Sequence, residues 1–305
     1  MCRPRPLGYI GTNNKNLADP STLISSLVVV RALISSMEKL YYGESRSRPD
    51  VFISEKTFTK VSDAVDRYAD GGTDFHKLAG LALLARSPER AHRLAEAIRE
   101  DTGNSPQLRW DALRVLLACA PSAEARKFAI KTLKVDDQQD VATAVRFLVN
   151  GVSGIRLLRK KIRLNLSSYP SDPTVKQVGK MIVPEPPPGL QVGDVQHLLK
   201  HTDVEVAALA GYLAAIMGDA AGLAPLRRHW EVDKVKYGVD TLMYRAIAVI
   251  NDPRWIPVLE EIYEQYDHDD YEIRDMYWTI RIMTGPVILK LRKRIRTEVG
   301  AERLR

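Results

Sequence analysis

Two segments rich in basic side chains are the parts of the sequence best suited to holding an anionic group. They read GIRLLRKKIRLN over residues 154–165 and VILKLRKRIRTE over residues 287–298, with the same apolar and basic pattern. On a helix, residues at i, i+3, i+4 and i+7 share one face. That spacing predicts a basic stripe in the first segment, made of Arg156, Arg159, Lys160 and Arg163. The second segment repeats it with Lys290, Lys293 and Arg294.

These stripes have two interpretations. On an exposed binding face they can hold the phosphates of a nucleic acid or the carboxylates of an acidic partner protein. Otherwise they are solvated helix faces, and cations near a helix C-terminus also suit its dipole. The formal net charge of +7 is compatible with both interpretations.

Aromatic side chains cluster in one part of the chain. Nine lie within one short stretch: Trp230, Tyr237, Tyr244, Trp255, Tyr263, Tyr266, Tyr271, Tyr277 and Trp278. Aromatic residues at helical spacing are usually core, whereas exposed ones beside arginine can bind a partner protein or stack on bases. Tyr277 and Trp278 are adjacent, so they cannot both point inward. Trp255 and Trp278 are the aromatic residues that we expect to contact a partner.

Charge is segregated along the last third of the chain. The stretch from Asp252 to Asp275 is strongly acidic, and the stretch from Met276 to Arg305 is strongly basic. A duplex lying along both stretches would be repelled by the acidic one. This pattern favours a protein partner, or pairing of the two stretches with each other, over a nucleic acid.

Other site chemistry finds little support. His197 and His201 stand at i and i+4, but no HExxH glutamate lies between them, and the acidic run 266–272 lacks the glycine and terminal glutamate of a calcium loop. There is no GxSxG motif and no glycine-rich phosphate loop. Cys2 and Cys119 cannot form a disulfide framework. We therefore expect no catalytic residue, no metal and no cofactor.

Composition points to a protein of the cytoplasm. Apolar residues make up 45% of the chain and charged residues 27%, as in ordinary soluble proteins. The apolar run at residues 23–34 is too short to span a bilayer and contains Arg31. We expect no membrane segment and a cytoplasmic location.

A period of 33 residues organises the elements that carry these side chains. Starting from Ser87-Pro88, steps of that length reach Ala120-Pro121, Ser153-Gly154, Pro186-Pro187, Asp219-Ala220, Asp252-Pro253 and Gly285-Pro286. Proline suits the first turn of a helix, where its missing N–H has no intrahelical partner. The marks therefore predict helix starts, and amphipathic stretches lie on both sides of most of them.

The predicted unit is a pair of helices joined by a short turn. Second helices are expected at 88–100, 121–134, 154–165, 220–232, 253–266 and 286–299. Their first helices are expected at 74–86, 105–119, 138–150, 203–217, 238–250 and 270–283. The fourth mark falls in PEPPPG, residues 184–189, so a lengthened turn is expected there, between a helix opened by Asp172-Pro173 and another at 191–201.

This pattern of paired helices resembles the HEAT-like repeats, which are related to armadillo units, over roughly residues 74–299. The signatures of tetratricopeptide and ankyrin repeats are absent. The resemblance implies an all-α, right-handed α-α superhelix, or solenoid, of about seven to eight helix pairs. It also implies that second helices line a concave binding face and that no catalytic residue comes with the repeat.

The predicted domain organisation follows from this pattern. Residues 1–20 form an irregular N-terminal extension, 21–70 an atypical capping helix pair, 71–299 the HEAT-like solenoid and 300–305 a C-terminal tail. The expected function is a non-enzymatic scaffold that binds a partner protein, with an acidic surface, through its concave face. The alternative is a nucleic-acid-binding or DNA-repair protein similar to the alkylpurine glycosylases, for which Trp110 and Asp111 have suitable types but diverge on a helix.

Overall fold

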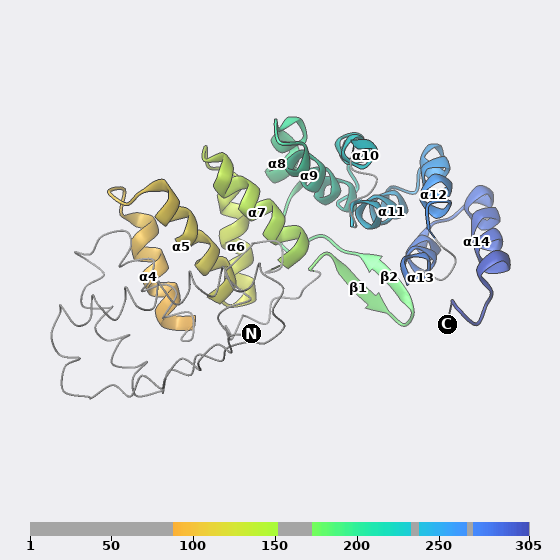
Figure 1. Cartoon of the computed structure of the whole chain (residues 1–305), viewed down its shortest axis with the longest axis horizontal. Coiled ribbons are helices and arrows are strands. Elements are labelled where there is room, and N and C mark those ends of the chain that lie inside the picture. Colours follow the sequence, from red (N-terminus) through yellow and green to blue (C-terminus); the bar gives the residue numbers. More distant parts are fainter. Residues whose placement is uncertain (1–87, 152–172, 233–237, 267–270, 305) are drawn as a thin grey trace, which may run out of the picture. The chain divides into compact units, whose positions relative to one another are not determined.

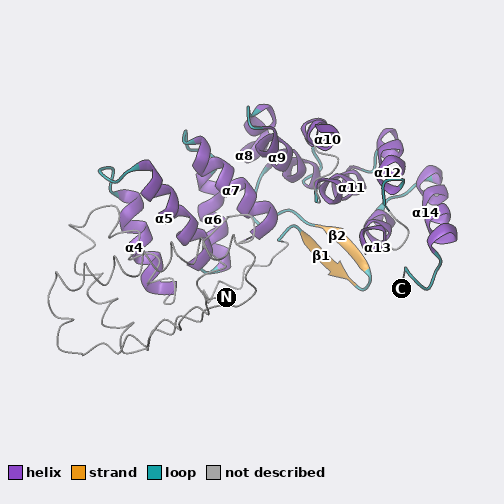
Figure 2. Ribbon diagram, viewed as in Figure 1, coloured by secondary structure: helices purple, strands orange, loops and turns teal. Residues whose placement is uncertain are grey.

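The structure is a computed structural model that describes residues 88–151, 173–232, 238–266 and 271–304. Within these ranges the chain is mostly helical, with one two-stranded sheet (Figures 1 and 2). The described residues divide into two compact units, 88–115 in the first and those from 116 onward in the second. The prediction of a mainly helical protein is confirmed. The expected helices at 74–86 and 154–165, the N-terminal extension and the capping pair lie outside the described residues.

The helices expected around the period marks other than the fourth are present wherever the structure describes them. The first helices of the pairs are α5 (Pro106–Cys119), α7 (Gln138–Asn150), α9 (Val204–Ile216), α11 (Val239–Ile250) and α13 (Tyr271–Thr279). The second helices are α4 (Pro88–Glu100), α6 (Ser122–Thr132), α10 (Leu223–Val232), α12 (Ile256–Tyr263) and α14 (Pro286–Val299). Short 3-10 turns extend three of them: η3 (Ala220–Gly222), η4 (Pro253–Trp255) and η5 (Ile280–Ile282).

Aspartate side chains begin several of these helices. Asp219 and Asp252, at corresponding positions of the repeat, each accept a hydrogen bond from the backbone N–H two residues on, at 3.0 Å. Asp137 and Asp203 do the same at the start of α7 and α9, at 2.9 Å. These bonds satisfy amide groups that a helix start leaves without a partner. The period marks at Asp219 and Asp252 are therefore physical helix starts.

A pair of hydrogen bonds spans one period of the repeat. The Asn251 side chain donates to Thr284 Oγ1 at 3.0 Å and accepts from the Thr284 backbone N–H at 3.1 Å, across 33 residues of sequence. Asn251 ends α11 in the left-handed region at φ 52°, which asparagine tolerates better than most residues. The ends of two successive first-helix segments are therefore joined at equivalent positions.

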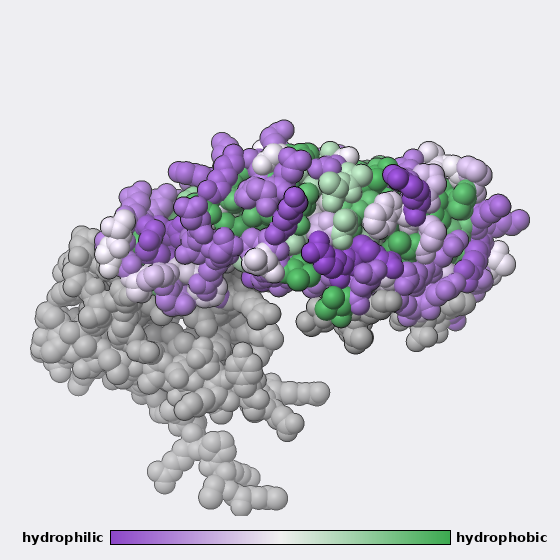
Figure 3. Space-filling view, turned by 90° about the horizontal axis from the view of Figure 1, so that it is seen from above, coloured by the Kyte–Doolittle hydropathy of each residue, from purple (hydrophilic) through white to green (hydrophobic). Residues whose placement is uncertain are grey.

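The buried faces of the helices agree with the predicted apolar stripes. Ile288, Leu291 and Ile295 are buried on α14. On the preceding first-helix segment the buried residues at helical spacing are Ile273, Met276, Tyr277, Ile280 and Met283. On α7 they include Val141, Val145 and Leu148. The second helices leave hydrophilic side chains outside, and hydrophilic residues cover much of the surface seen in Figure 3.

Helix α9 is buried on all sides. Every residue from Val206 to Ile216 is buried, and the helix packs against α7, α10 and α11. A helix that is apolar all round belongs in a core or in a membrane. No helix in the described part of the chain has both the length and the apolar content needed to cross a membrane. The burial of α9 is therefore explained by the helices around it.

Two glycines, Gly211 on α9 and Gly222 in η3, let α9 approach the segment of η3 and α10 closely. A Cβ atom on Gly211 would contact the carbonyl oxygen of Gly222 and would lie 2.8 Å from Pro225 Cγ. A Cβ atom on Gly222 would contact the carbonyl oxygen of Gly211 and would lie 2.9 Å from the Ala215 nitrogen. The helix pair therefore needs glycine at both positions.

Packing in the second unit runs from each helix to its neighbours in the series. α6 contacts α7, α7 contacts α9, α9 contacts α10 and α11, α11 contacts α12 and α13, and α12 contacts α14. Ion pairs add to these contacts: Arg146 pairs with Glu205 at 2.7 Å between α7 and α9, and Arg227 pairs with Glu261 at 2.9 Å between α10 and α12. Helices that follow one another in the second unit therefore pack together through their buried faces.

The helix predicted to open at Asp172-Pro173 is wrong. This part of the chain is a β-hairpin of β1 (Val175–Val178) and β2 (Met181–Pro184), paired antiparallel with Val178 opposite Met181. Gly179 takes φ +62° in the two-residue turn, which Lys180 completes with a negative φ, as a type II′ turn requires. The β-branched residues of VKQV and MIVP favour strands on either side of that turn.

The segment after the hairpin agrees with the prediction in part. Residues 185–189 form the expected non-helical connection. The helix expected at 191–201 is shorter, with a single α-turn, α8 (Val192–Val195), followed by the 3-10 turn η2 (Gln196–Lys200). Asp194 closes a capping box with Gln191 and pairs with Lys134 at 2.8 Å, which ties this turn to the chain after α6.

Candidate functional site

The basic residues predicted to bind a partner divide between the described and undescribed parts of the chain. Arg156, Arg159, Lys160 and Arg163 lie outside the described residues. Lys290, Lys293 and Arg294 are exposed on α14. Of these three, Arg294 is engaged within the chain, because it pairs with Glu264 of α12 at 3.2 Å and with Glu298 at 3.0 Å. Its guanidinium also lies 5.2 Å from the centroid of the Tyr263 ring.

The Arg294 contacts show one pairing between the acidic and basic stretches of the sequence. Tyr263 on α12 adds to it by donating a hydrogen bond to Glu298 at 2.6 Å. Burial and this carboxylate raise the pKa of Tyr263, so the phenol stays protonated and remains a donor. Part of the segregated charge therefore serves the contact between α12 and α14.

The two tryptophans predicted as contact residues occupy different settings. Both are half-buried. Trp255 lies in η4 at the start of the second-helix segment. Trp278 lies on α13 and lines a pocket, whereas its neighbour Tyr277 is buried, as expected for adjacent residues on a helix. The structure therefore gives Trp278 a place in a candidate site.

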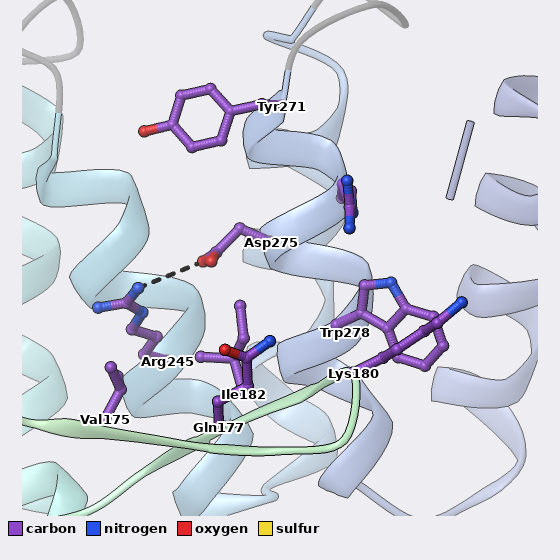
Figure 4. Close-up of a pocket in the computed structure, with 9 residues that line it drawn as sticks. Val175, Gln177, Lys180, Ile182, Arg245, Tyr271, Asp275 and Trp278 are labelled. Atoms are coloured by element: carbon purple, nitrogen blue, oxygen red, sulfur yellow. Dashed lines mark hydrogen bonds and ion pairs between the residues drawn. The ribbon is translucent and has the colours of Figure 1, made fainter. Parts of the chain in front are cut away.

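That pocket lies between the β-hairpin and helices α11 and α13 (Figure 4). Its volume is about 420 Å³, within the ~300–1,000 Å³ range of ligand sites. The hairpin, α11 and α13 supply its lining: Val175, Gln177, Lys180, Ile182, Arg245, Tyr271, Arg274, Asp275 and Trp278. The hairpin that sequence reasoning missed is therefore what encloses the site.

The hairpin is fixed to the helices at its start and along β2. At its start, buried Thr174 shares a hydrogen bond of 3.0 Å with the hydroxyl of Tyr212 on α9. Along its length, β2 packs against α11, α13 and η5. Alternation along the strands then turns Val175 and Gln177 of β1, together with Ile182 of β2, to the pocket side. The pocket wall is therefore positioned by packing.

An ion pair lines the pocket, and a buried phenol behind the lining supports it. Arg245 on α11 lies 3.4 Å from Asp275 on α13, and the two side chains point toward each other in Figure 4. The buried hydroxyl of Tyr244 donates to the same Asp275 oxygen. Burial and the adjacent carboxylate raise the pKa of Tyr244 well above its ordinary value. Asp275 is therefore held by two donors from α11, and this group joins α11 to α13.

The rim of the pocket carries positive charge. Lys180 and Arg274 are exposed, and no carboxylate of the described residues lies within ion-pairing distance of either. Lys180 Nζ lies 5.7 Å from the Trp278 ring centroid, and the guanidinium of Arg281 lies 5.1 Å from it. With Arg245 against Asp275, the lining has three cations and one carboxylate. The pocket is therefore suited to an anionic group next to an aromatic surface.

Sequence reasoning found Trp278 but missed the residues that surround it. Lys180 comes from the hairpin, Arg245 from α11, and the adjacent Arg274 and Asp275 from α13, and none belongs to a recognisable motif. One local signal was present in the sequence. Gly179-Lys180 between two short β-branched runs is typical of a hairpin turn.

The histidines considered for metal binding have other partners. His197 Nε2 is 3.1 Å from the Leu133 carbonyl oxygen, and His201 Nδ1 accepts from the Asp203 N–H at 3.0 Å. His201 Nε2 also contacts the Gln138 side chain. In the first unit, Arg114 stacks on Trp110 at 4.6 Å and pairs with Asp111 at 3.0 Å. His197, His201, Trp110 and Asp111 therefore each have a structural role.

Comparison with known proteins gives no relative. The sequence matches no protein-family model, no curated protein and no solved structure.

Proposed function

We propose that this chain is a non-enzymatic, HEAT-like repeat scaffold that binds a partner protein, with the pocket between the hairpin and helices α11 and α13 as the anchor of that contact. The observation that carries the proposal is the pocket itself, which combines the half-buried Trp278 with cations that have no ion-pair partner among the described residues. Aromatic and arginine side chains in a concave site are typical of the residues that dominate protein interfaces.

The repeat part of the proposal rests on the helix pairs. Corresponding helices begin at Asp219 and Asp252, and Asn251 bonds Thr284 one period later. Units that contact their neighbours in series share a continuous core, which is how a solenoid is built. Solenoids offer extended binding surfaces, and here the hairpin adds a pocket on the side of the first helices.

The polar groups of the pocket also favour binding over catalysis. Asp275 accepts from Tyr244 and pairs with Arg245, so its carboxylate is already engaged by two groups of the protein. Tyr244 has a raised pKa and keeps its proton, so it is a poor nucleophile. These contacts give both groups a structural role in joining α11 to α13.

Site-specific photo-crosslinking tests the proposal. A photoreactive amino acid would replace Gln177 in the pocket, Lys293 on α14 or, as the control, exposed Ala224 on α10. We expect a protein to be captured in the native cell from position 177 and not from position 224, and capture from 293 would extend the surface to α14. Equal capture from 177 and 224, or capture of nucleic acid alone from 177, would contradict the proposal.

A further inference from the structure

We propose that the pocket recognises an acidic peptide segment, with a glutamate or aspartate carboxylate between Lys180 and Arg274 and an apolar neighbour against Trp278. This inference rests on the proposed function and names the chemistry of the partner. It assigns the two rim cations the role of ligands for one carboxylate, and it assigns the indole the role of an apolar platform.

The charges of the lining determine the sign of the ligand. Arg245 shares Asp275 with Tyr244, so the inner carboxylate is already satisfied by protein groups. Lys180 comes from the hairpin turn and Arg274 from α13, and both line the same cavity without a carboxylate of the described residues in range. An incoming carboxylate would complete the pairing of these two cations with charge-assisted hydrogen bonds.

The apolar half of the lining indicates what stands next to the carboxylate. Val175 and Ile182 lie on the pocket side of the hairpin, and Trp278 lies on the opposite wall (Figure 4). The Trp278 ring nitrogen already donates to the Leu304 carbonyl oxygen at 2.8 Å. This bond fixes the indole, which favours contact with an apolar side chain at low entropic cost.

A peptide fits this surface better than a phosphate chain. The carboxylate of Asp275 lies inside the pocket, and Glu272 stands one turn away on the same helix. A nucleic acid carries a charge at every phosphate, so it would bring further anions toward these two carboxylates. A peptide can place one carboxylate at the cations and apolar residues on either side of it.

Fluorescence anisotropy with synthetic peptides tests the inference on the full chain. The probe is a labelled peptide in which glutamate alternates with leucine, and its matched control has glutamine in place of glutamate. We expect the glutamate peptide to bind at least about tenfold more tightly than the control, with an affinity that falls as salt increases. Equal binding of the two peptides would overturn the inference.

Charge-removing variants locate the binding. Arg274→Gln and Lys180→Gln should each weaken the binding of the glutamate peptide by about tenfold. Arg228→Gln on α10 removes the same charge from an exposed residue that does not line the pocket, and it should change affinity by less than about twofold. All three side chains are exposed, so an unchanged thermal transition will show that each variant is folded. Equal effects of Arg228→Gln and Arg274→Gln would refute the assignment.

Competition separates this inference from the proposed function. Inorganic phosphate or a single-stranded oligonucleotide that displaces the peptide more effectively than a glutamate-leucine competitor would overturn the carboxylate assignment. A protein captured from position 177 through a segment without acidic residues would also overturn it, while leaving the proposed function intact. If no protein is captured from position 177 and the glutamate peptide does not bind, both proposals are wrong.

Discussion

Replacing Ile262 with aspartate is expected to lower the free energy of unfolding by about 4 kcal/mol or more. Ile262 is 1% exposed on α12, a helix that contacts α11 and α14. Burying a carboxylate at this apolar position costs free energy, and the site also loses the packing of the isoleucine side chain. Because repeat units stabilise their neighbours, α14 should lose protection together with α12.

Urea unfolding and hydrogen exchange measure this effect. The matched control is Leu289→Asp, because Leu289 is 57% exposed on α14 and its substitution should change stability by less than about 0.5 kcal/mol. Similar midpoints for the two variants would contradict the burial of Ile262 between α12 and its neighbours.

Replacing Gly211 with alanine is expected to destabilise the protein by about 3 kcal/mol. In a helix interior, alanine is ordinarily better than glycine by about 1 kcal/mol. Here the added Cβ would meet the Gly222 carbonyl oxygen and Pro225, so α9 and α10 would have to separate. The steric cost exceeds the gain in propensity because the nearest obstacle is backbone, which cannot rotate away.

Gly193→Ala on α8 is the matched control for Gly211→Ala. A Cβ atom at Gly193 meets nothing within 4 Å, so the substitution should be neutral or stabilising by up to about 1 kcal/mol. Thermal unfolding of both variants compares the two sites. If Gly211→Ala proved as stable as Gly193→Ala, the close approach of α9 and α10 would be wrong.

Much of the helical architecture could be predicted because its signals are local. Asp252-Pro253 and Gly285-Pro286 mark helix starts through caps and fixed backbone angles, and apolar spacing gives the buried faces of α13 and α14. The hairpin was not predicted, because the 33-residue period called for a first helix before the fourth mark and Asp172-Pro173 looked like its start. There the local turn and strand preferences of Gly179 and its neighbours decide the structure.

The candidate site could be predicted only at Trp278. Trp278 follows buried Tyr277 on the same helix, and adjacent residues of a helix point in different directions, so helical geometry alone predicts that Trp278 is partly exposed. By contrast, Lys180 meets Trp278 only because the hairpin folds onto α13, and Arg245 meets Asp275 only because α11 packs beside α13. Such pairings depend on tertiary contacts that a single sequence does not specify.

Removing one complete unit is the clearest perturbation of the repeat. Deleting residues 253–285 joins Asp252 to Pro286, so that α14 follows α11 as α12 does in the full chain. Thr284 then disappears as the partner of Asn251, but each remaining helix keeps a neighbour of the kind it packs against. Deleting residues 253–269 instead removes a second helix alone, and this control should unfold the end of the array.

The most direct test of the account is thermal unfolding of the chain lacking residues 253–285, followed by circular dichroism. Tandem, interchangeable helix pairs predict a helical spectrum and one cooperative transition, at a lower temperature than in the full chain. An aggregated product, or a helical signal that declines without a transition, would contradict the repeat on which the proposed scaffold depends.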